Sequence, residues 1–126
     1  MIAALSSWHE HHDAAASAVA DVSALPAHVV IECYSVLTRL PGGLAVAPEL
    51  AAEVLGRRFP HPPLRLHDAA RGTVLADLAR VGVCGGASYD GVVALEAAAH
   101  GRRLLSLDRR AHRTYARLGV AFDVIG

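Results

Sequence analysis

The chain of 126 residues contains no lysine: all twelve of its basic residues are arginine, and twelve acidic residues balance them to a formal net charge of zero. A balanced charge argues neither for nor against a polyanionic partner. Codon bias in a GC-rich genome explains the arginine preference most simply, although arginine is also the better bidentate ligand for phosphate. Net charge therefore assigns no partner.

Cysteine and long apolar runs are also scarce. The two cysteines, Cys33 and Cys84, lie far apart and match no metal-ligand spacing, which is typical of small core residues in a reducing compartment. No uninterrupted apolar run approaches about 18 residues, so we expect neither a membrane span nor a secretory signal. The length suits one domain, and we expect a cytoplasmic protein with a single domain over residues 1–126.

Two tempting motifs are incomplete. The glycines of Gly82–Gly86 are not followed by the GK[ST] that a phosphate-binding loop requires. Near the start, His9, His11 and His12 suggest a metal site, but adjacent residues on a helix point about 100° apart. His11 and His12 would then not share one ion, so a solvated helix face is the better interpretation.

The remaining pattern predicts alternating helices and strands. Helices are expected over residues 1–22, 32–40, 48–59, 68–81, 88–100 and 109–118, and short strands over 28–31, 64–67, 103–107 and 120–125. Strands that alternate with helices indicate an α/β domain with a parallel sheet. Such a domain usually opens on a strand, whereas this chain enters a helical pattern directly at Met1.

The stretch from Ser88 to Asp108 is the most informative part of the chain. Ser88 is a suitable helix N-cap, and Asp90 falls in the first turn, where the helix dipole favours negative charge. Gly101 is a typical helix stop. A short strand follows, with Asp108 at its C-terminal end. Asp68 is expected to act only as the cap of its own helix.

Three acids are expected at one edge of the sheet. In an open α/β sheet the C-termini of strands and the N-termini of packing helices share an edge, where ligands bind. Asp90 and Asp108 should therefore meet there, and Glu32 should join them because it follows the strand predicted over 28–31. Alone, Asp90 or Asp108 could simply support a helix terminus or a turn. Together with Glu32 they favour a functional site.

Clustered carboxylates raise one another's pKa and cost stability unless a cation compensates them. Oxygen ligands without histidine or cysteine suit Mg²⁺ or Mn²⁺, which can activate water and neutralise charge on a phosphodiester. Four arginines on both sides of the last acid could grip phosphate groups: Arg102, Arg103, Arg109 and Arg110. Single-stranded RNA is a natural substrate for such an open edge. A phosphohydrolase with a nucleophilic aspartate is a weaker alternative, because the chain has no DxD-type pair.

The spacing of these residues resembles a known family. The pattern is Asp90-x-x-x-Ala94-x-x-Ala97-x-x-x-Gly101-x-x-Leu104-x-Ser106-x-Asp108. It is similar to the C-terminal signature of PIN-domain ribonucleases, the VapC toxins of bacterial toxin–antitoxin pairs. The run from Ile31 to Pro41 resembles the second acidic motif of that family and the helix after it. The resemblance covers essentially the whole chain.

The resemblance implies a three-layer fold, in which helices flank both faces of a parallel sheet, and an endoribonuclease that depends on Mg²⁺ or Mn²⁺. Glu32, Asp90 and Asp108 would be the second, third and fourth acids of the family's catalytic, metal-holding set, and Ser106 would support the site. The resemblance also implies a homodimer and a cognate antitoxin protein that silences the enzyme.

The chain departs from the family pattern at its beginning. The family opens with a strand that ends in an aspartate, and Met1–Leu5 matches only the part after that aspartate. We therefore expect the true start to lie upstream. The alternative is a catalytically weak or inactive relative, kept for dimerisation or for binding an antitoxin.

Overall fold

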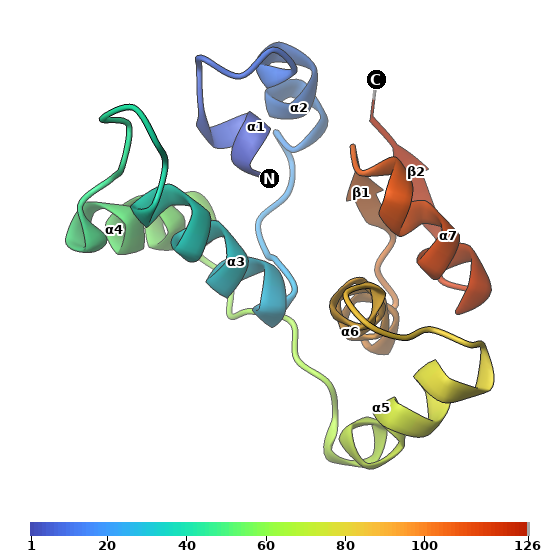
Figure 1. Ribbon diagram of the computed structural model, residues 1–126. Coiled ribbons are helices and arrows are strands. Elements are labelled where there is room, and N and C mark those ends of the chain that lie inside the picture. The colour runs from blue at the N-terminus through green and yellow to red at the C-terminus, as the bar shows by residue number, and fades with distance from the viewer. Residues whose placement is uncertain (126) are drawn as a thin grey trace. The chain divides into compact units, whose positions relative to one another are not determined.

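The computed structural model describes residues 1–125, which fall into two compact units, Met1–Pro63 and Leu64–Gly126 (Figure 1). Among the described residues, no helix combines the length and the apolar character that a membrane crossing requires.

The first unit contains four helices: α1 Ile2–Leu5, α2 His12–Ala18, α3 Ala27–Thr38 and α4 Pro48–Arg58. Pro48 occupies the first turn of α4, where its missing N–H costs nothing. The longer helices α3 and α4 pack against each other. Their core residues are Leu25, Cys33, Leu37, Ala51, Leu55 and Phe59.

Two sequence predictions for the first unit are wrong. The helix expected over residues 1–22 is interrupted by turns between Leu5 and His12. The strand expected over residues 28–31 does not form, because these residues belong to α3, which begins at Ala27 directly after Pro26. The β-branched run is only four residues long, and propensity over such a length yields to the helix that continues after it.

The second unit contains α5 Asp68–Arg80, α6 Ala87–Ala99, β1 Leu104–Ser106, α7 Arg109–Arg117 and β2 Phe122–Val124. The two strands pair in parallel, with Leu104 opposite Phe122 and Ser106 opposite Val124. A parallel sheet in an α/β fold is therefore confirmed. Within residues 1–125 the sheet has two strands, because the strands expected over 28–31 and 64–67 are absent.

Helix α6 begins two residues earlier than it would if Ser88 were its N-cap. Its N-cap is Gly86, which follows Gly85 in the left-handed region at φ 57°, so Ser88 lies inside the first turn. The capping role expected of Asp68 is likewise wrong: His67 is the N-cap of α5, and Asp68 lies in the first turn. Its carboxylate lies 3.7 Å from Arg71 and is fully exposed.

Close packing of α6 on α5 depends on a glycine. A Cβ atom at the buried Gly91 would collide with the side chain of Leu78. After α6 ends, the chain reverses direction at Gly101, whose φ of 62° suits glycine, as the sequence predicted. This reversal sends the chain back into β1.

Candidate metal and nucleic-acid site

Asp108 is held at the C-terminal end of β1 by two hydrogen bonds. Its backbone N–H donates to Oγ of the buried Ser106 over 3.1 Å, and its Oδ1 accepts from the backbone N–H of Arg110 over 2.9 Å. Asp108 is thus the N-cap of α7. The carboxylate is exposed but fixed in direction, and Ser106 supports the backbone that carries it.

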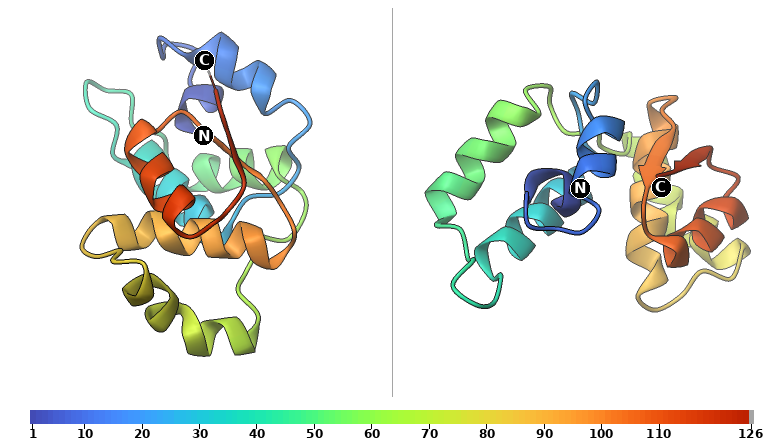
Figure 2. Two further views of the ribbon diagram at one scale, coloured as in Figure 1. Left: turned by 90° about the vertical axis from the view of Figure 1, so that its right-hand side faces the viewer. Right: turned by 90° about the horizontal axis from the view of Figure 1, so that it is seen from above.

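Asp90 lies in the first turn of α6 and is half-buried. Both views of Figure 2 show the chain leaving the end of α6 and running back along β1 toward the side on which α6 begins. The start of α6 and the end of β1 therefore share one end of the second unit. Asp90 belongs to the first turn of α6, and Asp108 directly follows β1.

Glu32 lies in the first unit, in the middle of α3 rather than at the strand-to-helix junction that the sequence predicted. Its carboxylate is 3.2 Å from Nε2 of His28, one helical turn earlier, and 54% of its side chain is exposed. The topological reason for grouping Glu32 with the other two acids is therefore wrong. Within either unit, residues 1–125 contain no group of three or more histidine, cysteine, aspartate or glutamate side chains arranged to hold a metal ion.

The four arginines separate into two pairs. Arg109 and Arg110 begin α7, next to Asp108. Arg102 and Arg103 precede β1, and an extended segment from Arg103 to Asp108 spans up to about 16 Å at 3.3 Å per residue. Arg109 and Arg110 thus adjoin Asp108 in the sequence, whereas Arg102 and Arg103 precede the other end of β1.

Arg103 already has a partner. Its Nε donates to Oδ2 of Asp123 over 3.1 Å and its Nη2 donates to Oδ1 over 2.7 Å. This bidentate pair raises the pKa of Arg103 and lowers the pKa of Asp123, chiefly through the side-chain hydrogen bond. It links β1 to β2, so Arg103 has a structural role beside the phosphate contact that the sequence suggested.

Glu96 is an acid that the sequence interpretation missed. It lies on α6 with only 7% of its surface exposed, beside the buried Val93 and Ala97. A buried carboxyl group persists only where it is hydrogen-bonded or paired. The one available signal was its position three residues after Val93, at the margin of the apolar face.

His9 and His11 lie in the turn between α1 and α2, and His12 is the first residue of α2, so the three do not share the helix face that the sequence suggested. Nδ1 of His9 accepts a hydrogen bond from the backbone N–H of His11 over 3.1 Å. Nδ1 of His12 donates to the carbonyl of Ala3 over 2.9 Å. These contacts tie the turn to α1 and α2, which pack against each other.

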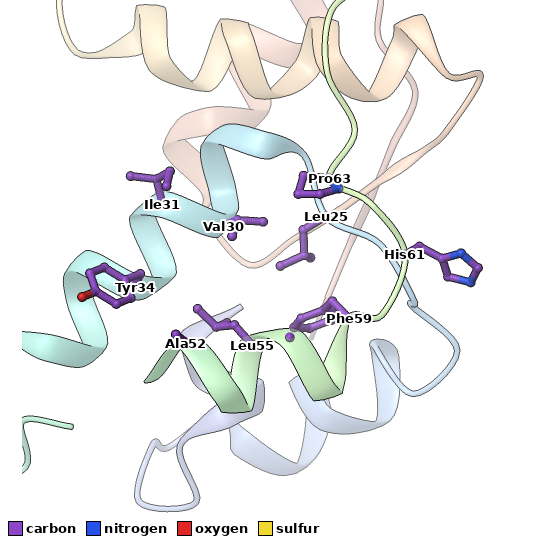
Figure 3. Close-up of a pocket in the computed structure, with 10 residues that line it drawn as sticks. Leu25, Val30, Ile31, Tyr34, Ala52, Leu55, Phe59, His61 and Pro63 are labelled. Atoms are coloured by element: carbon purple, nitrogen blue, oxygen red, sulfur yellow. The ribbon is translucent and has the colours of Figure 1, made fainter. Parts of the chain in front are cut away.

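A pocket of about 320 Å³ lies in the first unit between α3, α4 and the segment that follows α4. Figure 3 shows Leu25, Val30, Leu55 and Phe59 directed toward it, and the ring of His61 directed away. No acidic residue lines this pocket. It offers apolar contact, and the chemistry of the site is elsewhere.

Comparison with known proteins decides the family. The model of the PIN domain family matches residues 1–117. The chain belongs to the PIN domain family. Ribonuclease VapC40 of Mycobacterium tuberculosis (strain CDC 1551 / Oshkosh) is 38% identical over 125 residues, which cover 99% of this chain and 93% of that protein. Ribonuclease VapC27 of M. tuberculosis (strain ATCC 25618 / H37Rv) is 42% identical over 118 residues, covering 94% and 79%. No solved structure matches the chain.

The small parallel sheet is thus that of a PIN-domain protein. Matches of this extent cover both units, including the segment that carries Glu32. The family is therefore shown for nearly the whole chain.

Proposed function

We propose that this PIN-domain protein is an endoribonuclease that cleaves RNA phosphodiesters with Mg²⁺ or Mn²⁺. The observation that carries the proposal is the similarity, over nearly the whole chain, to two proteins named as ribonucleases. The location of Asp90 in the first turn of α6 and of Asp108 directly after β1 supports it, because helix starts and strand ends are where ligands bind in α/β folds.

The donor set fits a hard divalent cation. Asp108 uses one carboxylate oxygen to cap α7 and retains the other, and the fixed direction of this group lowers the entropy lost on ligation. Asp90 and Asp108 would hold the metal, and the family resemblance implies Glu32 as a further member of the acidic set. When bound, the ion would supply charge neutralisation on the phosphate and a water of lowered pKa.

The surrounding residues would orient the substrate. Arg109 and Arg110 stand next to Asp108 and are exposed, so their guanidinium groups are suited to phosphate oxygens. Arg102 would contact a phosphate further along the RNA. Arg103 would first have to leave Asp123, which makes it the weakest member of the set.

By the same resemblance, we assign to the protein the role of a toxin in a toxin–antitoxin pair. Its partners would be an RNA substrate, a cognate antitoxin protein that silences it, and a second copy of the chain in a homodimer. The balanced net charge of the chain is compatible with a local arginine cluster rather than a uniformly basic surface.

The test is cleavage of single-stranded RNA with and without Mg²⁺ or Mn²⁺. We expect metal-dependent cleavage that Asp90→Asn lowers by at least about 100-fold, since loss even of a supporting hydrogen bond to a metal ligand costs 10- to 100-fold. Asp68→Asn is a matched control, because it makes the same change in the first turn of the neighbouring helix α5. Unchanged cleavage by Asp90→Asn would refute the assignment of this residue.

A second candidate is a PIN-domain module that no longer cleaves RNA and serves dimerisation or antitoxin binding. The observation that favours it is the absence, within either unit as described, of three metal-binding side chains in one group. Such a module would remain folded but would not cleave RNA in the presence of either Mg²⁺ or Mn²⁺.

A further inference from the structure

Two histidines in the second unit form a reciprocal clasp. His67, the N-cap of α5, has its Nε2 2.9 Å from the carbonyl oxygen of Ala99 at the end of α6. His100, the C-cap of α6, has its Nε2 2.8 Å from the carbonyl oxygen of Arg65. The ring centroids are 5.4 Å apart and the rings are tilted by 43°.

The clasp fixes the tautomer of both rings. A carbonyl oxygen only accepts, so each Nε2 must carry a proton and donate it. In the neutral imidazole the other nitrogen, Nδ1, then holds a free lone pair. The second unit therefore contains two neighbouring, exposed imidazoles in the same tautomer. In each of them Nε2 carries the proton, and Nδ1 can bind a metal.

We propose that His67 and His100 form a binding site for a divalent transition-metal cation of the zinc type, with Nδ1 of each ring as a ligand. Imidazole nitrogen suits zinc, copper and nickel. A histidine that ligates a metal characteristically donates its second ring N–H to a backbone carbonyl or a carboxylate, and both rings already make this hydrogen bond.

A metal at this position would join two parts of the second unit. The segment of Arg65 and His67 leads into α5, and His100 follows α6 at the turn that reverses into β1. Because the metal would bind the folded state and not the unfolded state, it would stabilise the unit by mass action. The remaining coordination positions would be filled by water, because no third histidine, cysteine or acid joins this pair within residues 1–125.

The other neighbouring histidines of the chain are less suitable. The rings of His9 and His11 are 5.8 Å apart, but Nδ1 of His9 is occupied as an acceptor from the backbone N–H of His11. Its neutral tautomer therefore carries the proton on Nε2, which leaves no free lone pair on this ring. His9 thus serves as a matched control at a surface histidine pair.

The experiment is a calorimetric titration of the full chain with Zn²⁺, repeated with Mg²⁺. We expect one Zn²⁺ site that Mg²⁺ does not occupy, since Mg²⁺ prefers oxygen ligands. His67→Gln and His100→Gln should each weaken Zn²⁺ binding by at least about tenfold, and His9→Gln should leave it unchanged. The glutamine amide can still donate to the carbonyl, so the clasp is disturbed as little as possible.

A second readout locates the metal on the ring. In long-range ¹H–¹⁵N spectra, Zn²⁺ should shift Nδ1 of His67 and His100 while Nε2 keeps its proton. Absence of a Zn²⁺ site in the unmodified chain would overturn the proposal. So would binding that survives both substitutions, or that His9→Gln abolishes. None of these outcomes depends on RNA cleavage, so this proposal and the proposed function fail separately.

Discussion

The capping bond of Asp108 allows its structural and chemical roles to be separated. Two substitutions make the comparison: Asp108→Asn keeps an oxygen that can accept from the N–H of Arg110, and Asp108→Ala removes it. Both substitutions remove the negative charge that we assign to metal binding.

The magnitudes follow from the geometry at the start of α7. Loss of an N-cap acceptor costs about 1 kcal/mol, within a range of about 0.5–2. Asparagine caps almost as well as aspartate, so Asp108→Asn should cost only the dipole contribution of the charge, about 0.3–1 kcal/mol at an exposed position. For a domain of this size 1 kcal/mol corresponds to a shift in melting temperature of about 4 °C.

Thermal unfolding followed by circular dichroism, together with RNA cleavage by the same samples, is the assay. We expect Asp108→Ala to melt below Asp108→Asn, and both to lose cleavage equally. Equal melting temperatures for the two variants would refute the capping role. Full cleavage by Asp108→Asn would refute the chemical role.

Three further predictions concern packing, reactivity and charge. Leu37→Ala should lower the free energy of unfolding by about 2–5 kcal/mol in urea titrations, because Leu37 is buried in the core between α3 and α4. Burial raises the pKa of Cys33 to about 11, so at pH 8 about one molecule in a thousand carries its thiolate. Iodoacetamide followed by mass spectrometry should label the exposed Cys84 well before Cys33. Hydrogen bonding to Arg103 lowers the pKa of Asp123, so this pair adds stability above the unfolded pKa of about 3.9 and loses it as pH falls through the folded value. Asp123→Asn should therefore reduce the difference between urea midpoints at pH 7 and pH 3, and an unaltered difference would contradict this account.

The sequence predicted the second unit better than the first. In the second unit Gly101 and the alternation of helix and strand are strong local signals, and the structure confirms α6, β1, α7 and β2 in that order. The N-cap of α6 was wrong by two residues, because the glycine pair before it allows the helix to start earlier. Cap positions depend on backbone angles that side-chain identity only biases.

In the first unit, the sequence did not predict the secondary structure of the segment before Glu32. The run His28–Ile31 is apolar and β-branched, but such a short run does not distinguish a strand from a buried helix segment. Packing against α4 decides in favour of helix, and this moves Glu32 from a junction to the middle of α3. Glu96 was missed for a related reason, since burial of a single carboxyl group is set by neighbours distant in sequence.

Calorimetric titration with Mn²⁺ tests most directly our proposal that Asp90 and Asp108 hold a divalent metal. We expect a Mn²⁺ site in the unmodified chain that Asp90→Asn and Asp108→Asn each weaken by at least about tenfold, while Asp68→Asn leaves it intact. Mn²⁺ binding that is undiminished in both Asp90→Asn and Asp108→Asn would contradict it.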